Sequence, residues 1–211
     1  MLPKGLHLRL PRGIMSLPQI LTSKATNMQL ISWAVLLLGS AGVIFISRKS
    51  LLRPGSHGFY RFFAWEILLV LFARNLNDWF RDALASHQLV SWLLLVISLV
   101  LVIMGVRLLR DRGRQDAERS DPALLGLEKT AQLVTGGLYR YIRHPMYSSL
   151  LFLGWGMFFK SPSWIDAGLA LACSLFLAAT ARVEERENLG YFGEAYAAYM
   201  RHSKRFIPFV Y

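Results

Sequence analysis

The sequence predicts an all-α integral membrane protein with about five transmembrane helices, a C-terminal helical hairpin, and cytosolic helices and loops next to that hairpin. Three observations support this fold class. Apolar residues make up 54% of the 211 residues and charged residues only 18%, whereas soluble domains contain roughly 45–50% and 25%. The mean hydropathy is +0.36. The apolar residues are also gathered in blocks, which is typical of membrane spans.

Residues 1–27 are expected to form a basic arm at the membrane interface. The segment contains Lys and Arg but no acidic residue, and its prolines at positions 3, 11 and 18 argue against one continuous helix. It lacks the compact apolar stretch of a secretory signal. A faint similarity to an organelle transit peptide is the alternative interpretation.

Residues 28–106 are expected to hold three spans and to be the variable membrane region of the chain. The apolar runs at 28–46, 58–73 and 88–106 are close to the length that crosses a hydrocarbon core of about 30 Å. The second run carries Glu66. A carboxyl group is costly in lipid, so Glu66 needs either a partner or a place beside a gap between the helices.

Residues 107–122 are rich in Arg, Asp and Glu and predict a charged cytosolic connection. Residues 123–211 form the rest of the chain and begin with a loop in which leucines alternate with glycines. Two spans at 145–159 and 163–181 then follow, separated by three residues. So short a link predicts an antiparallel helical hairpin, whose first member is short for a full crossing and has to tilt or thin the bilayer.

The segment after the fifth span is expected to be helical in two pieces. The first piece continues from Arg182 to Gly190, and the glycine is expected to end it. Phe192, Tyr196 and Tyr199 recur at i, i+4 and i+7, the spacing of one face of a second short helix.

The basic residues predict the orientation in the membrane. The 47–61 loop, the 107–143 loop and the tail after 181 together hold 17 of the 24 Lys and Arg residues. The positive-inside tendency places this side, and with it the C-terminus, in the cytoplasm. A bacterial inner membrane is favoured and an organelle membrane is the alternative. The net charge of +11 is therefore assigned to anionic membrane lipids and not to nucleic acid.

A polar cluster precedes the fourth span. A residue before proline is pushed out of the α region, so His144 is expected to cap this helix, with Pro145 in its first turn. The free N–H groups of a helix start favour an anion such as a carboxylate or phosphate, and Arg143 adds a positive charge. The alternative is that Arg and Tyr side chains here serve as interfacial anchors.

A second cluster, Arg182-Val183-Glu184-Glu185-Arg186-Glu187, follows the fifth span. In a hairpin it lies at the same membrane face as His144. An anion receptor beside carboxylates suits a zwitterion, whose carboxylate and ammonium groups are held separately. The alternative is a solvated helix with pairs such as Arg182–Glu185 at i, i+3.

Both clusters carry a resemblance to a known family. The run Gln132-Leu133-Val134-Thr135-Gly136-Gly137-Leu138-Tyr139, followed by Arg143-His144-Pro145-Met146-Tyr147, resembles the signature of the isoprenylcysteine carboxyl methyltransferase family. Relatives of that family include the phospholipid methyltransferases. The second half is similar too, in its glutamate pair, Leu189, Phe192-Gly193, Tyr196, Tyr199 and Pro208. The resemblance covers roughly residues 123–211, which it implies are a methyltransferase core.

This resemblance implies a membrane-embedded methyltransferase that uses S-adenosylmethionine, with a lipid-like acceptor such as an isoprenylcysteine carboxylate or a phospholipid amine. Its cofactor-binding helices and loops would lie on the cytosolic side, and no metal is expected. Arg182 and Glu185 are candidates for the substrate side, although Arg182 is an approximate match, and Ala131 stands where a histidine often occurs. The implied cofactor-binding residues are Gln132, Leu133, Val134, Tyr139, His144, Pro145, Met146, Tyr147 and Glu184.

Two other functions stay open from the sequence. Sterol reductases and related NADPH-dependent membrane enzymes resemble this C-terminal region, but they are usually much longer. A non-catalytic membrane scaffold that keeps the hairpin is the second alternative. Binding of S-adenosylhomocysteine or of NADPH separates these functions.

Overall fold

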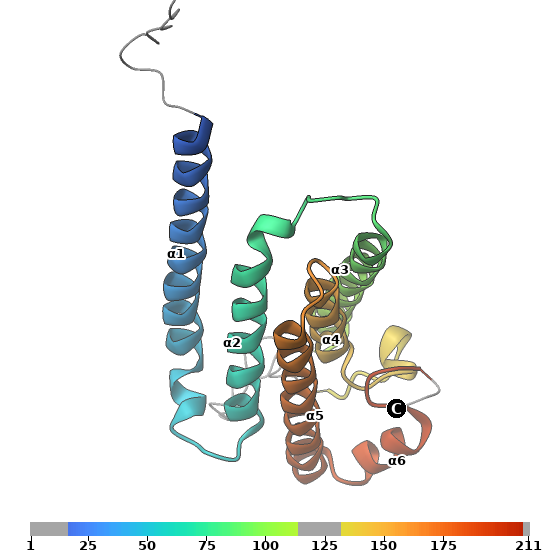
Figure 1. Ribbon diagram of the computed structural model, residues 1–211. Coiled ribbons are helices and arrows are strands. Elements are labelled where there is room, and N and C mark those ends of the chain that lie inside the picture. The colour runs from blue at the N-terminus through green and yellow to red at the C-terminus, as the bar shows by residue number, and fades with distance from the viewer. Residues whose placement is uncertain (1–16, 114–131, 209–211) are drawn as a thin grey trace, which may run out of the picture.

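The computed structural model describes residues 17–113 and 132–208, and every regular element within them is a helix. The all-α prediction is confirmed for these residues. The helices are shown in Figure 1 and are α1 (Leu17–Leu51), α2 (His57–Asn75), α3 (Ser86–Arg112), α4 (Pro145–Phe158), α5 (Trp164–Phe192) and α6 (Glu194–His202), with short 3-10 turns η1 (Leu76–Asp78) and η3 (Gly137–Arg140).

Three helices of the described residues are long and apolar enough to cross a membrane. They are residues Thr26–Leu51 of α1, all of α3 and all of α5. The expected second and fourth spans are also helical, as α2 and α4, but they do not reach this length and composition. α4 has 14 residues and is about 21 Å long, and α2 carries Glu66 and three basic side chains. The described residues thus contain three helices of spanning type, as expected of a membrane protein.

Several boundaries differ from the sequence prediction. α1 begins at Leu17, so residues 17–27 of the expected basic arm belong to this helix, whereas 1–16 lie outside the described residues. Pro18 falls in the first turn of the helix, where its missing N–H is harmless. α3 runs to Arg112, so residues 107–112 of the expected connection are helical. Residues 114–122 of that connection, and 123–131 of the expected core, lie outside the described part.

The end of α5 also differs. Gly190 does not end the helix, which continues to Phe192. The break comes at Gly193, whose φ of +58° is in the left-handed region that glycine adopts without a steric penalty. Phe192 therefore belongs to α5, while Tyr196 and Tyr199 lie on α6.

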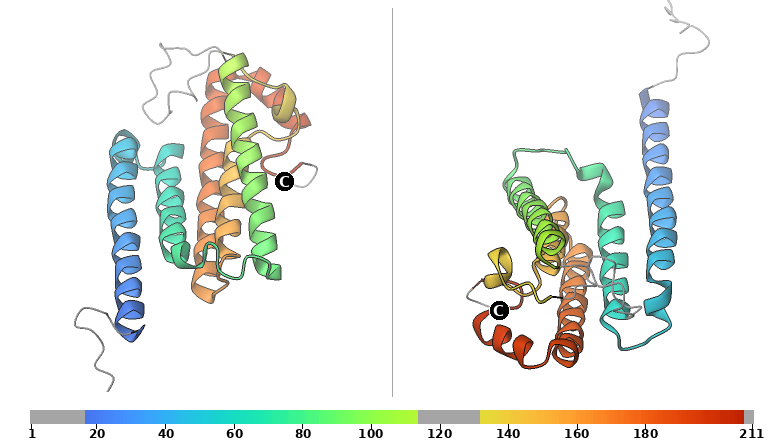
Figure 2. Two further views of the ribbon diagram at one scale, coloured as in Figure 1. Left: turned by 90° about the horizontal axis from the view of Figure 1, so that it is seen from above. Right: turned by 180° about the vertical axis from the view of Figure 1, so that it is seen from behind.

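Contacts between helix ends define how the bundle is arranged. α1 lies at one edge beside α2, as Figures 1 and 2 show. At one end of the molecule, Arg143 before α4 pairs with Glu185 near the end of α5. At the other end, Lys160 after α4 contacts Gln88 of α3. The start of α4 and the end of α5 therefore share one end of the bundle.

Small residues bring α3 and α4 close together. Ser91, Ser98 and Gly105 follow one another every seven residues on α3. The Ser91 hydroxyl donates to Gly156 O at 2.7 Å, and the Ser98 hydroxyl donates to Ser149 O at 2.7 Å. A Cβ on Gly105 would be 3.5 Å from the Pro145 ring. This close approach of small residues, with hydroxyls bonded to a facing backbone, is typical of helices that pack in membranes.

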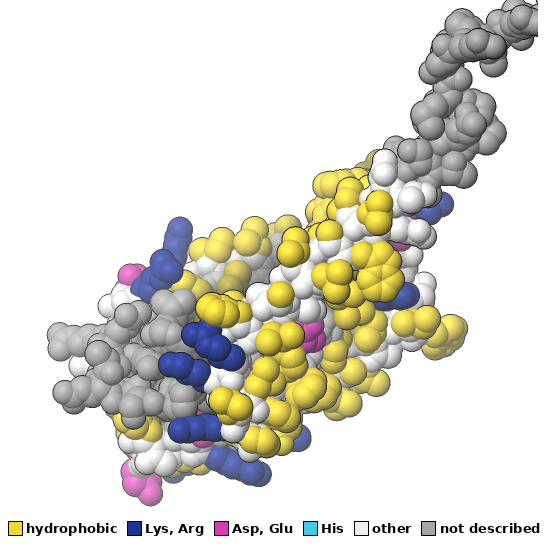
Figure 3. Space-filling view, turned by 90° about the vertical axis from the view of Figure 1, so that its left-hand side faces the viewer, with side chains coloured by type: hydrophobic (Ala, Val, Ile, Leu, Met, Phe, Trp, Pro, Cys, Tyr) yellow, Lys and Arg dark blue, Asp and Glu magenta, His cyan; other side chains and the backbone are white. Residues whose placement is uncertain are grey.

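The outer surface matches a membrane environment. Large hydrophobic side chains of α1 and α3 are exposed, among them Leu37, Leu38 and Leu93. Figure 3 shows hydrophobic side chains over the helices and most of the visible Lys and Arg side chains gathered toward one end. Such a band of apolar side chains with a basic end suits helices set in a bilayer beside anionic headgroups.

Candidate active site

A cavity lies at the end of the bundle where α4 begins and α5 ends. Its empty volume is about 640 Å³, its open mouth included. Residues from α3, the η3 segment, α4, α5 and α6 line it, so chain segments far apart in sequence meet here. The lining residues are Leu109, Leu133, Val134, Tyr139, Arg143, His144, Pro145, Met146, Tyr147, Glu184, Asn188, Phe192, Tyr196 and Tyr199.

His144 lines this cavity at the start of α4, where the proline that follows it keeps it out of the helix. It caps α4 with φ −123° and ψ 62°, and Pro145 occupies the first turn, as the sequence predicted. The His144 side chain is 4% exposed, and its ring stacks on that of Tyr147 with centroids 5.4 Å apart. The N-terminus of α4 thus opens toward the cavity, with an imidazole and a phenol at its edge.

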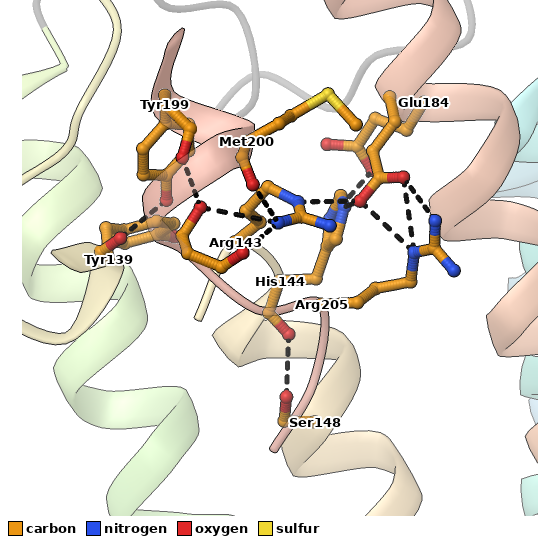
Figure 4. Close-up of polar contacts among 10 residues, drawn as sticks. Tyr139, Arg143, His144, Ser148, Glu184, Tyr199, Met200 and Arg205 are labelled. Atoms are coloured by element: carbon orange, nitrogen blue, oxygen red, sulfur yellow. Dashed lines mark hydrogen bonds and ion pairs between the residues drawn. The ribbon is translucent and has the colours of Figure 1, made fainter. Parts of the chain in front are cut away.

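A buried ion cluster adjoins the cavity, and Figure 4 shows its members Arg143 and Arg205. Arg143 Nε donates to Glu185 Oε1 at 2.8 Å, and Arg205 Nη2 donates to Glu185 Oε2 at 2.6 Å. Arg143 Nη1 also donates to the backbone oxygens of Ser203 and Met200. The Glu185 side chain is 4% exposed. Both of its oxygens are therefore engaged by arginines that come from different parts of the chain.

The neighbouring carboxylate, Glu184, has a different environment. Its Oε2 is buried and has no hydrogen-bond partner among the described residues. The His144 Nδ1 atom lies 3.8 Å from this oxygen. A buried carboxylate oxygen without a donor is costly, so Glu184 is well placed to receive a cationic or N–H group of a ligand.

The C-terminal tail pairs with the segment before α4. Arg143 N donates to Lys204 O at 2.8 Å, Lys204 N to Tyr141 O at 2.9 Å, and His144 N to Arg205 O at 3.1 Å. These bonds make a short parallel bridge between Ile142 and Lys204. The tail thereby holds the backbone of His144 in place.

α6 closes the cavity with two buried tyrosines. The Tyr199 hydroxyl donates to Tyr139 O at 2.6 Å. Burial raises the pKa of Tyr196, and the carboxylate of Glu184 raises it further. Burial also raises the pKa of Tyr199. Both hydroxyls stay protonated and can donate a hydrogen bond at any pH near neutrality.

The structure brings together eight of the nine residues predicted to bind a cofactor. Gln132 does not line the cavity, and its backbone N–H donates to Gly113 O at 3.3 Å. Neither candidate for the substrate side lines the cavity: Glu185 is held by Arg143 and Arg205, and Arg182 lies outside the lining set.

Several functional residues were missed from the sequence. Asn188 lies four residues after Glu184 on α5, and this i, i+4 spacing could have placed it on the same face. Phe192, Tyr196 and Tyr199 were recognised as a helical pattern but not as a cavity wall. Arg205 had no local signal, because its role depends on how the tail folds back.

Comparison with known proteins decides the family. The family model described as phospholipid methyltransferase matches residues 87–197, more than half of the chain. The chain belongs to the phospholipid methyltransferase family. This match runs from the start of α3 into α6 and includes most of the cavity. No curated protein and no solved structure matches the chain. The family is one of membrane methyltransferases, so the resemblance inferred from the sequence is confirmed.

Proposed function

We propose that this protein transfers a methyl group from S-adenosylmethionine to the amine of a phospholipid, at the basic end of the bundle. The observation that carries the proposal is the buried Oε2 of Glu184, which accepts no hydrogen bond from the described residues and lies beside His144 in a cavity of a methyltransferase-family chain. A site for a zwitterionic amino-acid group needs separate anionic and cationic poles, and the cavity contains both.

The residues present fit the cofactor. Glu184 suits its ammonium group, while Arg143 and the N-terminus of α4 suit its carboxylate. The aromatic faces of Tyr147 and Tyr196 favour a cation such as a sulfonium. When bound, S-adenosylmethionine supplies a methyl group on positively charged sulfur, which becomes a neutral thioether after transfer. The cavity residues act by holding donor and acceptor in line, and such positioning supplies much of the acceleration.

An apolar crevice next to the cavity supports a lipid as the acceptor. It runs along α4 between α3 and α5, and its lining residues are Leu94, Ser148, Leu151, Phe152, Trp155, Phe159, Ser174, Ala178, Phe206 and Ile207. The three polar groups in it are already bonded: Ser148 to Phe206 O, Ser174 to Ala170 O, and the Trp155 indole to Ser174. Such a surface suits hydrocarbon. An amine acceptor loses one proton before or during transfer, because an ammonium has no lone pair to attack carbon.

The membrane arrangement we propose keeps all five crossings, with α2 and α4 packed inside α1, α3 and α5 and the last two crossings forming a hairpin. α2 contacts α1, α4 and α5, so the carboxyl of Glu66 is shielded and bonded by the Ser40 hydroxyl at 2.7 Å. The basic end, with the C-terminus, faces the cytoplasm.

Calorimetry on the purified protein tests the proposal. We expect S-adenosylhomocysteine to bind and NADPH not to bind. Glu184→Gln should weaken binding roughly ten- to a hundred-fold, because a charge-assisted hydrogen bond contributes about 1.5–3 kcal/mol. Glu194→Gln is the matched control: this glutamate is exposed at the start of α6, outside the cavity, and should bind as the native protein does. Binding of NADPH alone, or equal affinity in both variants, would contradict the proposal.

A further inference from the structure

The polar cavity and the apolar crevice are neighbours that share no lining residue. Tyr147 lines the cavity and Ser148, the next residue on α4, lines the crevice. The crevice extends from Ser148 on α4 to Phe159, the residue that follows this helix, a length of about 16 Å. A lipid whose chain lies in the crevice therefore has its polar group close to the cavity but on the other side of a wall.

Two rings contribute to this wall. His144 faces the cavity and Phe206 faces the crevice, with ring centroids 6.2 Å apart and planes at 53°. Phe206 is 5% exposed and belongs to the hydrophobic core. Its carbonyl oxygen accepts a 2.7 Å hydrogen bond from Ser148. The side chain that divides the two spaces thus comes from the C-terminal tail and not from the helices.

We propose that Phe206 is the residue that selects the acceptor headgroup, because it sets the space through which the nucleophile passes from the crevice into the cavity. The inference rests on the proposed function. The Phe206 ring packs against His144 but does not itself line the cavity, whereas Glu184 does. A change in its size therefore alters which headgroup passes, while the cofactor pole at Glu184 stays as it is.

The experiment compares two acceptors with identical acyl chains, phosphatidylethanolamine and its N,N-dimethyl derivative, in detergent micelles with labelled S-adenosylmethionine. We expect Phe206→Ala to shift the ratio of kcat/KM values roughly tenfold toward the bulkier dimethyl headgroup, since one methylene in an apolar pocket changes selection by about 10–200-fold. Phe206→Trp should shift the ratio the other way. The dissociation constant for S-adenosylhomocysteine should stay within about twofold of the native value in both variants. The loss of a charged hydrogen bond would change it by far more than this.

Phe152→Ala is the matched control. Phe152 lines the crevice about one turn along α4 from Ser148, so its truncation should lower kcat/KM for both acceptors by the same factor. If the Phe206 variants bind S-adenosylhomocysteine and keep the native ratio of kcat/KM values for the two acceptors, the role proposed for Phe206 is refuted and the proposed function still stands. A native protein that binds no S-adenosylhomocysteine, or methylates neither lipid, would overturn the proposed function and this inference with it.

Discussion

The replacement Glu185→Gln tests whether the buried ion cluster holds the site together. In the native protein this carboxylate accepts hydrogen bonds from Arg143 at 2.8 Å and from Arg205 at 2.6 and 3.1 Å. The Glu185 side chain is 4% exposed, that of Arg143 is 8% exposed and that of Arg205 is 17% exposed. Glutamine keeps the shape but removes the negative charge, so two guanidinium groups lose their counter-ion.

The expected loss of stability follows from how deeply each arginine is buried. Removing one partner of a buried ion pair costs about 3–5 kcal/mol. Arg205 is partly exposed and can turn toward water, and Arg143 keeps the backbone oxygens of Ser203 and Met200. The cost should therefore lie at the low end, about 3 kcal/mol. For a chain of this size that corresponds to a fall in melting temperature of about 6–12 °C.

Thermal unfolding in detergent micelles, followed by tryptophan fluorescence, measures this effect. Glu184→Gln is the control: its carboxylate is next along the chain but lacks a hydrogen bond to Oε2, so the variant should stay within about 1 kcal/mol of the native protein. The reasoning fails if Glu185→Gln melts within 2 °C of the native protein, about the shift that 1 kcal/mol produces, or if the two variants lose equal stability.

Two further predictions concern packing and pH. A Cβ on Gly156 would lie 3.0 Å from the side chain of Leu95, so Gly156→Ala should lower the free energy of unfolding by about 1–3 kcal/mol. Gly168 has open space around it, so Gly168→Ala should stabilise α5 by about 0.5–1 kcal/mol. The melting temperatures of the two variants test both predictions. Burial raises the pKa of Tyr196 in the folded protein. The contribution of Tyr196 to the stability of the fold is therefore complete below the ordinary tyrosine pKa of about 10, and it is lost as the pH rises above that value. Melting temperatures at pH 9 and 11 should therefore fall less in Tyr196→Phe than in the native protein, and an equal fall would refute this.

The sequence was sufficient for the parts of the site that depend on local rules. A histidine before a proline has to cap the following helix, and His144 does so. The short link between the fourth and fifth predicted spans implied that His144 and Glu184 lie at one end of the bundle, and their side chains are 3.8 Å apart. Both results follow from backbone stereochemistry and chain length, which do not depend on the rest of the fold.

Contacts made by the tail could not be predicted in this way. Arg205 pairs with Glu185 because residues 203–206 fold back beside Ile142, and that return is fixed by backbone hydrogen bonds which no sequence pattern marks. The same return explains why Glu185 turned out to be engaged in an ion cluster, while the carboxylate beside it faces the cavity. Adjacent residues on a helix point about 100° apart, so the pair divides between the two environments.

The C-terminal tail is bound more strongly up to Arg205 than beyond it, and this difference affects how an acceptor reaches the cavity. Up to Arg205 it is fixed by the backbone bridge and by the ion pair with Glu185. Beyond Arg205, the Ser148 hydrogen bond and the burial of the Phe206 ring hold it. A neutral hydrogen bond contributes about 0.5–1.5 kcal/mol and burial of a phenylalanine about 1.5–3 kcal/mol. Displacing Phe206 therefore costs roughly 2–4.5 kcal/mol, which leaves about 0.05–3% of molecules open at any moment. Arg205 can stay paired during such a displacement, so we expect an opening of the wall to occur at Phe206 while the ion cluster and the backbone of His144 keep their places.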